Sequence, residues 1–164
     1  MNNMKSVLLT LLMTVLSVAA VAQDFATRFM AEHKKDANLT CITISPTMMK
    51  QILKVDAVEK DEKMADVISN LKSMQLITSK VRSAHYYQQA LKVVEKNANR
   101  FDPYLSSKDH FGESRIMVRR HKGAIVEMVM LTNYRRVFSV INFTGILSDE
   151  FISELARSMR QKRS

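Results

Sequence analysis

Three segments near the C-terminus have the composition of β-strands, and only short connections separate them. They run over residues 114–120, 124–132 and 137–143. His121-Lys122-Gly123 forms the first connection, in which the glycine can adopt the positive φ of a tight turn. Connections this short force neighbouring strands to run antiparallel. The sequence therefore predicts a three-stranded antiparallel meander.

The middle strand of this meander is largely apolar on both faces. Side chains alternate between the two faces of a strand, so Val126, Met128 and Met130 share one of them. Two arrangements fit this pattern. Either the strand is covered on both sides, or it is covered on one side and contacts a partner on the other.

The rest of the chain mixes helical and strand-like segments. Helical spacing of apolar residues predicts helices over 24–35, 83–98 and 149–160, and a short one over 46–53 with Met48, Met49 and Ile52 turned inward. β-Branched runs predict strands over 39–44 and 73–78, and an edge strand over 104–108. Residues 55–70 carry no decisive pattern. The predicted fold is α+β: a mostly antiparallel sheet ending in the meander, with helices packed on it and a C-terminal helix.

The N-terminal segment has the features of a secretory signal peptide. Lys5 supplies a basic start, an apolar run follows to Ala20, and Ala20-Val21-Ala22 fits the small-residue cleavage rule. We therefore expect residues 1–22 to be removed and residues 23–164 to form a single domain in the periplasm or outside the cell. The rest of the chain contains no apolar run long enough to span a bilayer.

The chain contains a single cysteine, Cys41. It cannot form an internal disulfide, and it lies too far from the apolar run to carry a lipid anchor, because Gln23 stands at that place. We expect Cys41 to be buried as a small apolar side chain in its strand. The exported domain is thus expected to be free of a lipid anchor and to depend on its core for stability.

Motifs for catalysis or metal binding are weak. The four histidines show no local ligand spacing, so neither a metal nor a cofactor is expected. Asp109, His110 and Glu113 are close enough in sequence to act as acid, base and orienting group, which leaves a small hydrolase or transferase as one alternative. The other interpretation of these residues is a polar turn. No residue is assigned as catalytic.

Basic residues are the strongest surface signal. The net charge of +9 suits contact with an anionic envelope component or an acidic partner, whereas nucleic acid is not expected for an exported chain. In a meander the two basic groups belong to opposite ends of the strands. The candidate anion- or partner-contacting residues are Arg115, Arg119, Arg120, His121, Lys122, Arg135 and Arg136.

Five segments together resemble a known family. They are Phe25–Met30, Cys41–Met49, Ser69–Ser79, Tyr86–Val94 and Ser114–Gly145. This order of patterns is similar to domain of unknown function 4252, a family of small secreted proteins from Bacteroidetes-group bacteria. The resemblance implies an export signal and an α+β fold, and it brings no catalytic residues.

These observations leave three hypotheses for function. The first is a non-enzymatic envelope protein that binds a partner, within a signalling or stress-response system. The second is the small hydrolase or transferase that uses Asp109, His110 and Glu113. The third is a structural subunit of an envelope assembly, which would associate through the sheet. The oligomeric state is left open.

Overall fold

The computed structural model describes residues 23–49, 51, 62–96 and 100–161. The expected signal segment over residues 1–22 lies outside this part of the chain, as do Ile52 and the first part, 55–61, of the segment 55–70. The described elements are α2 (Phe25–Glu32), β1 (Thr40–Ile44), α4 (Glu62–Ser69), β2 (Leu71–Ser79), α5 (Ser83–Glu95), β3 (Asp102–Asp109), β4 (Gly112–His121), β5 (Ala124–Tyr134), β6 (Val137–Leu147) and α6 (Asp149–Gln161).

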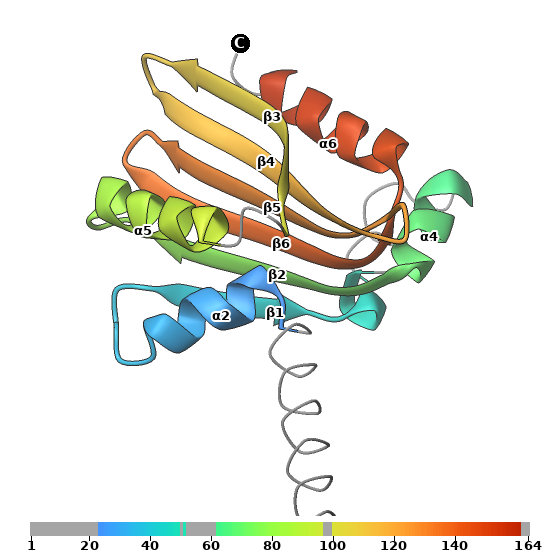
Figure 1. Ribbon diagram of the computed structural model, residues 1–164, viewed down its shortest axis with the longest axis horizontal. Helices are drawn as coiled ribbons and strands as arrows, with labels where there is room; N and C mark the ends of the chain where they lie inside the picture. The colour runs from blue at the N-terminus through green and yellow to red at the C-terminus, as the bar shows by residue number, and fades with distance from the viewer. Residues whose placement is uncertain (1–22, 50, 52–61, 97–99, 162–164) are drawn as a thin grey trace, which may run out of the picture.

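The strands form one six-stranded antiparallel sheet in the order β1-β2-β6-β5-β4-β3. The predicted meander is β4, β5 and β6, and the predicted edge strand is β3. The last strand in the sequence, β6, lies between β2 and β5 and joins the two halves of the sheet (Figure 1). The α+β fold with an antiparallel sheet and a C-terminal helix is therefore confirmed.

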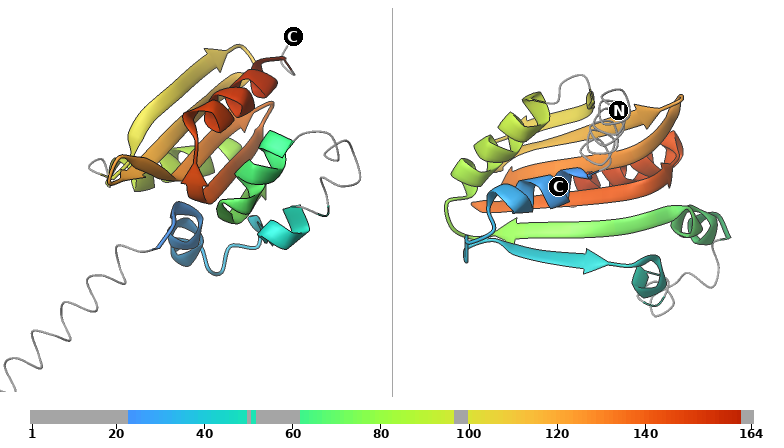
Figure 2. Two further views of the ribbon diagram at one scale, coloured as in Figure 1. Left: turned by 90° about the vertical axis from the view of Figure 1, so that its right-hand side faces the viewer. Right: turned by 60° about the horizontal axis from the view of Figure 1, so that its bottom comes forward.

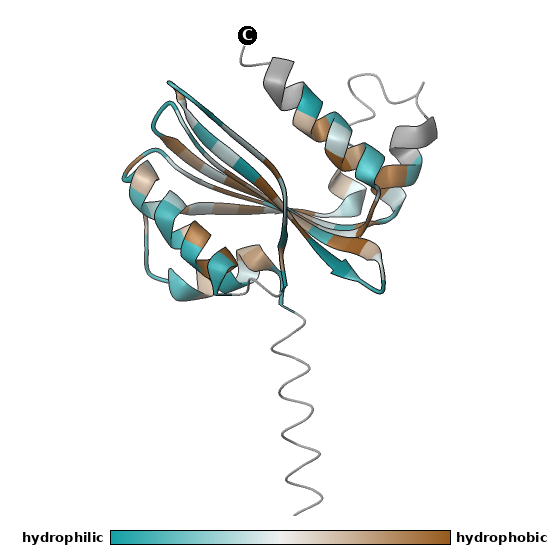
Figure 3. Cartoon of the chain, turned by 45° about the horizontal axis from the view of Figure 1, so that its top comes forward, coloured by the Kyte–Doolittle hydropathy of each residue, from teal (hydrophilic) through white to brown (hydrophobic). Residues whose placement is uncertain are grey.

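Helices cover both faces of the sheet. Helices α2 and α5 lie on one face, and α4 and α6 lie on the other (Figures 1 and 3). Each face has its own apolar core: Phe29, Tyr86 and Val129 belong to the first, and Met128 and Ile152 to the second. Of the two arrangements predicted for the middle strand of the meander, coverage on both sides is the one observed.

The two faces of β5 differ from the predicted alternation at one point. Opposite β4, Arg119 pairs with Glu127 and Arg120 pairs with Ile125, so a β-bulge adds one residue to β5 at this point. Ile125 therefore joins Met128 and Met130 in the second core, in the place expected for Val126. A simple period of two could not predict this, because a bulge shifts the alternation by one residue.

Helix starts follow the expected capping chemistry. The Asp24 carboxylate accepts the backbone N–H of Thr27 at 2.7 Å, and the Ser148 hydroxyl accepts that of Phe151 at 3.1 Å. The Ser45 hydroxyl accepts the N–H of Met48 at 3.2 Å, as expected for a helical turn that begins at Pro46. These bonds satisfy amides that have no partner inside their helix.

Two side chains expected inside are exposed. Cys41 is exposed because β1 is an edge strand with few neighbours, so its predicted burial is wrong. Burial of part of its surface still raises the pKa of the thiol. Met48 is 47 % exposed, whereas Met49 is buried as predicted. The short turn after β1 thus buries one methionine and presents the other to solvent.

Candidate functional site

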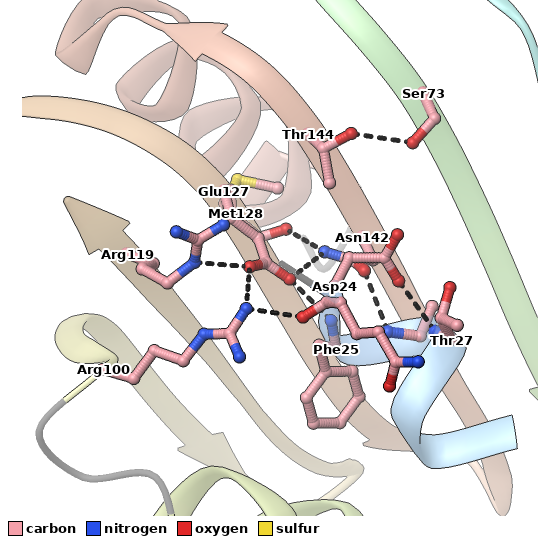
Figure 4. Close-up of polar contacts among 12 residues, drawn as sticks. Asp24, Phe25, Thr27, Ser73, Arg100, Arg119, Glu127, Met128, Asn142 and Thr144 are labelled. Carbon is pink, nitrogen blue, oxygen red and sulfur yellow. Dashed lines mark hydrogen bonds and ion pairs between the residues drawn. The ribbon is translucent and has the colours of Figure 1, made fainter. Parts of the chain in front are cut away.

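A buried carboxylate is the most unusual polar group in the core. Glu127 is fully buried in β5 on the face covered by α2. Its Oε1 accepts the backbone N–H of Phe25 at 2.7 Å and the Asn142 amide at 3.2 Å, and its Oε2 accepts Arg119 Nε at 2.8 Å (Figure 4). Burying a charged side chain is costly unless close partners compensate for it. Ionisable groups in such surroundings often belong to functional sites, so Glu127 is a candidate.

The start of helix α2 completes this network. The Asn142 side chain accepts the N–H of Ala26 at 2.9 Å and donates to the carbonyl of Met128 at 3.1 Å. The first amides of α2 thus bind Glu127 and Asn142, and the positive end of the helix dipole faces a carboxylate. The arrangement anchors α2 to the centre of the sheet.

Two arginines balance the charge of Glu127. Arg119 forms the close ion pair, and Arg100 Nη2 lies 3.8 Å from Oε2. Burial, with the nearby charge of Arg119, lowers the pKa of Arg100 below its usual range. Because Glu127 has no exposed surface and donors occupy both oxygens, it cannot reach a substrate in this conformation. We assign the network a structural role.

The predicted acid–base group forms a tight turn. Asp109 Oδ1 accepts the backbone N–H groups of Phe111 at 2.8 Å and Gly112 at 3.1 Å. His110 is exposed, and its ring centroid lies 3.7 Å from that of Phe111. Glu113 pairs across the strands with Lys108. These contacts identify Asp109 as an acceptor that holds the β3–β4 turn, as the interpretation of a polar turn predicts.

The predicted basic residues do not form one patch. Arg119 is committed to Glu127 inside the fold, and Arg120 Nη2 lies 3.3 Å from Asp149 Oδ1 at the start of α6. Arg115 is half-buried in β4. The remaining basic residues of this set lie at opposite ends of the sheet. His121 ends β4 and Lys122 follows it in the β4–β5 turn, whereas Arg135 and Arg136 form the β5–β6 turn.

The sheet register gathers a different set of cations. Thr40 pairs with Thr78, Ser79 with Phe138, and Tyr134 with both Val137 and Gly112. The α2–β1, β2–α5, β3–β4 and β5–β6 connections therefore all lie at the same end of the sheet (Figure 1). Each supplies exposed basic residues at or beside it. We call this set the cationic end: Lys34, Lys35, Lys80, Arg82, Lys108, Arg135 and Arg136.

Backbone strain coincides with these cations. Among the described residues, every non-glycine residue with positive φ is basic: Arg82 at 51°, Lys122 at 50°, Arg135 at 50° and Arg136 at 62°. The left-handed region costs a residue with a side chain about 1–2 kcal/mol, and Gly or Asn normally occupies it. Three of the four residues belong to the cationic end. Strain of this kind concentrates at functional sites.

The surroundings of two of these arginines are also distinctive. Arg82 is the N-cap residue of α5, makes no capping bond through its side chain, and meets the positive end of the helix dipole. The Arg135 guanidinium lies 4.8 Å from the ring centroid of Phe111 and 5.6 Å from that of Tyr134. A stacked guanidinium is held in place while its in-plane N–H groups can donate to a carboxylate or phosphate.

A hydrogen bond joins the α2–β1 connection to the first turn of α5. The Tyr86 hydroxyl of α5 donates to Asp36 Oδ2 at 2.6 Å, and Asp36 Oδ1 accepts the N–H of Asn38 at 3.0 Å. The Tyr86 bond is the main reason why the pKa of Asp36 lies below its usual value. An open hollow lined by residues 31–38 adjoins this bond. The α2–β1 connection, which carries Lys34 and Lys35, is thereby tied to the start of α5.

Sequence reasoning identified Arg135 and Arg136 but missed the other members of the cationic end. Lys34 and Lys35, like Lys80 and Arg82, are separated from them by long stretches of chain. The sequence did contain one indication of a shared site, because each of these residues lies close to the end of a strand. That signal becomes useful only once the strand order is known.

The described residues offer neither a metal-binding cluster nor a membrane-spanning helix. They contain no group of three or more His, Cys, Asp or Glu side chains that could hold a metal ion. Across the same residues, no helix has the length and apolar character needed to cross a membrane.

A family model matches most of the chain. No curated protein and no solved structure is significantly similar to the chain. The model of one family, described as a domain of unknown function (DUF4252), matches residues 32–155. That range includes all six strands and α5, and it extends into α6. The chain therefore belongs to the DUF4252 family.

Proposed function

We propose that this chain is a non-enzymatic binding protein that holds an anionic partner at its cationic end. The observation that carries the proposal is the strained backbone of Arg82, Arg135 and Arg136, which all lie at that end. Folding alone favours glycine or asparagine at such positions. Arginine at these positions is therefore explained better by a role of its side chain in binding than by a role in folding.

Charge and geometry indicate the kind of group that binds. Arg135 is pre-oriented by Phe111 and Tyr134, and Arg136 is exposed beside it. Guanidinium groups bind carboxylates and phosphates through paired hydrogen bonds. Acidic groups at this end, including Asp36 and Asp109, already accept hydrogen bonds within the fold. The proposed partner is an envelope protein or envelope component that presents several carboxylates or phosphates.

The test measures binding of a fluorescein-labelled oligoglutamate peptide by fluorescence anisotropy at low and at physiological ionic strength. The variant Arg135→Asn/Arg136→Gly removes both charges and supplies the residues that a type I′ turn prefers. We expect its affinity to fall at least about tenfold while the fold is retained, because two charge-assisted contacts are lost.

The matched control is Lys122→Asn. Lys122 has the same left-handed backbone, with φ 50°, but lies in the turn at the opposite end of the sheet. Its removal deletes one charge without touching the cationic end, and the affinity should stay within about twofold of the parent. If the loss of binding free energy per removed charge is the same in the two variants, only net charge matters, and the proposal would be abandoned.

We also propose that the protein is exported after removal of residues 1–22. The support is the basic start at Lys5, the apolar run and the Ala20-Val21-Ala22 site. Intact mass measured on the protein from the periplasmic or culture fraction should place its first residue at Gln23. A chain that retains Lys5 and stays in the cytoplasm would contradict this.

A further inference from the structure

The two edges of the sheet are built differently. The outer strand β3 carries Pro103 and Lys108, and a bulge interrupts its pairing between Pro103 and Leu105. Proline, lysine and bulges are the devices by which proteins prevent another strand from adding to an edge. The β3 edge is therefore protected.

The β1 edge has none of these devices. Its sequence, Thr40-Cys41-Ile42-Thr43-Ile44, is uncharged, contains no proline and pairs with β2 without a bulge. In the described part of the chain no strand lies beyond it (Figure 2). An edge of this kind offers unpaired backbone N–H and C=O groups in a regular row.

An apolar shelf accompanies this row. Ile42 is 48 % exposed, although its cross-strand partner Leu76 is half-buried. Ile44 lies on the same face and packs at the margin of the second core. Side chains of an added strand that point to this face would cover Ile42. Strand addition obtains its affinity from the backbone and its specificity from such side-chain contacts.

The cationic end lies where β1 begins. Lys34 and Lys35 precede β1 in the connection from α2, and Lys80 and Arg82 follow β2 at the same end. All four are exposed, and none forms an ion pair with a described acidic residue. An occupant of the β1 edge therefore meets positive charge at one end and a neutral strand along its length.

A second copy of the chain fits this edge poorly. Pairing two β1 strands would place two strongly basic molecules against each other through strands of five residues. A stable dimer needs about 1,200 Å² or more of buried surface, and a contact limited to two short strands does not supply it. A single extended segment needs less area and meets no repulsion when it is acidic.

We propose that β1 accepts an extended segment of an acidic partner protein as an additional, antiparallel strand. A strand antiparallel to β1 ends where β1 begins, so the acidic residues of the segment lie at its C-terminal end and meet Lys34, Lys35, Lys80 and Arg82. This inference rests on the proposed function, because it names the class of partner that the cationic end recognises.

The test uses synthetic peptides. The forward peptide has alternating Val and Thr residues and ends in three Glu residues, and the reversed peptide begins with the Glu residues. We expect the forward peptide to bind at least tenfold more tightly. Two further forward peptides carry N-methyl groups on alternate Val/Thr positions, in the two possible phases. One phase blocks the amides that face β1, so it should lose at least tenfold in affinity while the other binds as before.

The native thiol of Cys41 reports the place of binding. The forward peptide should slow its reaction with a maleimide at least severalfold. The matched control carries Ser106→Cys in a Cys41→Ser background, because Ser106 is exposed on the protected β3 edge. The peptide should leave the rate at that position unchanged.

Each result decides the proposal. Equal binding of the two methylated peptides, or equal protection at both edges, overturns strand addition. If Arg135→Asn/Arg136→Gly still weakens oligoglutamate binding in that case, the proposed function stands without it. A dimer in sedimentation equilibrium, with Cys41 protected before any peptide is added, assigns the edge to a second copy and also overturns the proposal.

Discussion

The Glu127 carboxylate accepts the backbone N–H of Phe25 at 2.7 Å, across 102 residues of sequence. This bond connects the first residue of α2 to a residue near the start of β5. The bond gives the buried carboxylate one of its close partners, beside the ion pair with Arg119.

Replacement of Glu127 should therefore be severe. Glu127→Ala leaves Arg119 and the start of α2 without their acceptor, and we expect the free energy of unfolding to fall by about 3–5 kcal/mol. Urea denaturation measures it. The control is Glu154→Ala, which breaks the exposed ion pair with Arg157 and should cost at most about 0.5 kcal/mol. Similar losses for the two variants would show that the buried network is not an anchor.

Replacement of Arg135 and Arg136 in the β5–β6 turn should instead stabilise the fold. Arg135→Asn/Arg136→Gly relieves two left-handed residues and loses the stacking of Arg135 on Phe111. We expect the free energy of unfolding to rise by about 1 kcal/mol, because relief of strain outweighs a partly exposed cation–π contact. Thermal denaturation checks this. A less stable variant would mean that these arginines serve the fold, and the strain argument for binding would lose its basis.

Gly112 should tolerate no side chain. Its φ is +150°, and a Cβ there would lie 2.0 Å from the carbonyl oxygen of Asn133 on the neighbouring strand. Gly112→Ala should lower the free energy of unfolding by about 3 kcal/mol or more, since backbone must move. Gly123→Ala is the control: its φ is +84° but nothing lies within 4 Å, so only about 1 kcal/mol is expected. Equal effects in chemical denaturation would refute the close approach.

Acid stability should depend on Tyr86. The Tyr86 hydroxyl lowers the pKa of Asp36 from its ordinary 3.8, so this bond stabilises the fold above that pH and is lost as the pH falls through the lowered pKa. Tyr86→Phe should raise the pKa of Asp36 and move acid unfolding to higher pH.

NMR titration of the Asp36 carboxyl carbon measures this pKa directly. The control is Tyr104→Phe, which removes a hydroxyl that contacts Ser153 at 3.0 Å and no carboxylate. It should leave the pKa of Asp36 where it is. An Asp36 carboxyl that titrates alike in the parent and in Tyr86→Phe would contradict the assignment.

Local patterns predicted the local elements well. The meander followed from short connections around Gly123, and α5 followed from helical spacing, because both depend on residues near each other in sequence. The position of β6 between β2 and β5 could not be predicted in this way. It depends on pairs such as Leu76 with Ile141, which no periodicity reports.

The candidate site also depends on residues that are distant in sequence, and the sequence therefore predicted it poorly. Sequence proximity favoured Arg119 and Arg120, yet both form ion pairs within the fold. Lys34, Lys80 and Arg136 are distant in sequence and share an end of the sheet only through the strand register. The burial expected for Cys41 was wrong for a related reason, since a β-branched strand can lie at an edge or in the centre.

The central position of β6 determines when the chain can fold during its synthesis. Until residues 137–147 have been synthesised, β1 and β2 have no strand to join them to β5, β4 and β3, and the first turn of α2 lacks Asn142, to which it binds. The N-terminal half therefore cannot complete its contacts before the C-terminal half has been made. A newly made chain of this design therefore stays incompletely folded for almost the whole time of its synthesis. The sheet is completed only when β6 has been made.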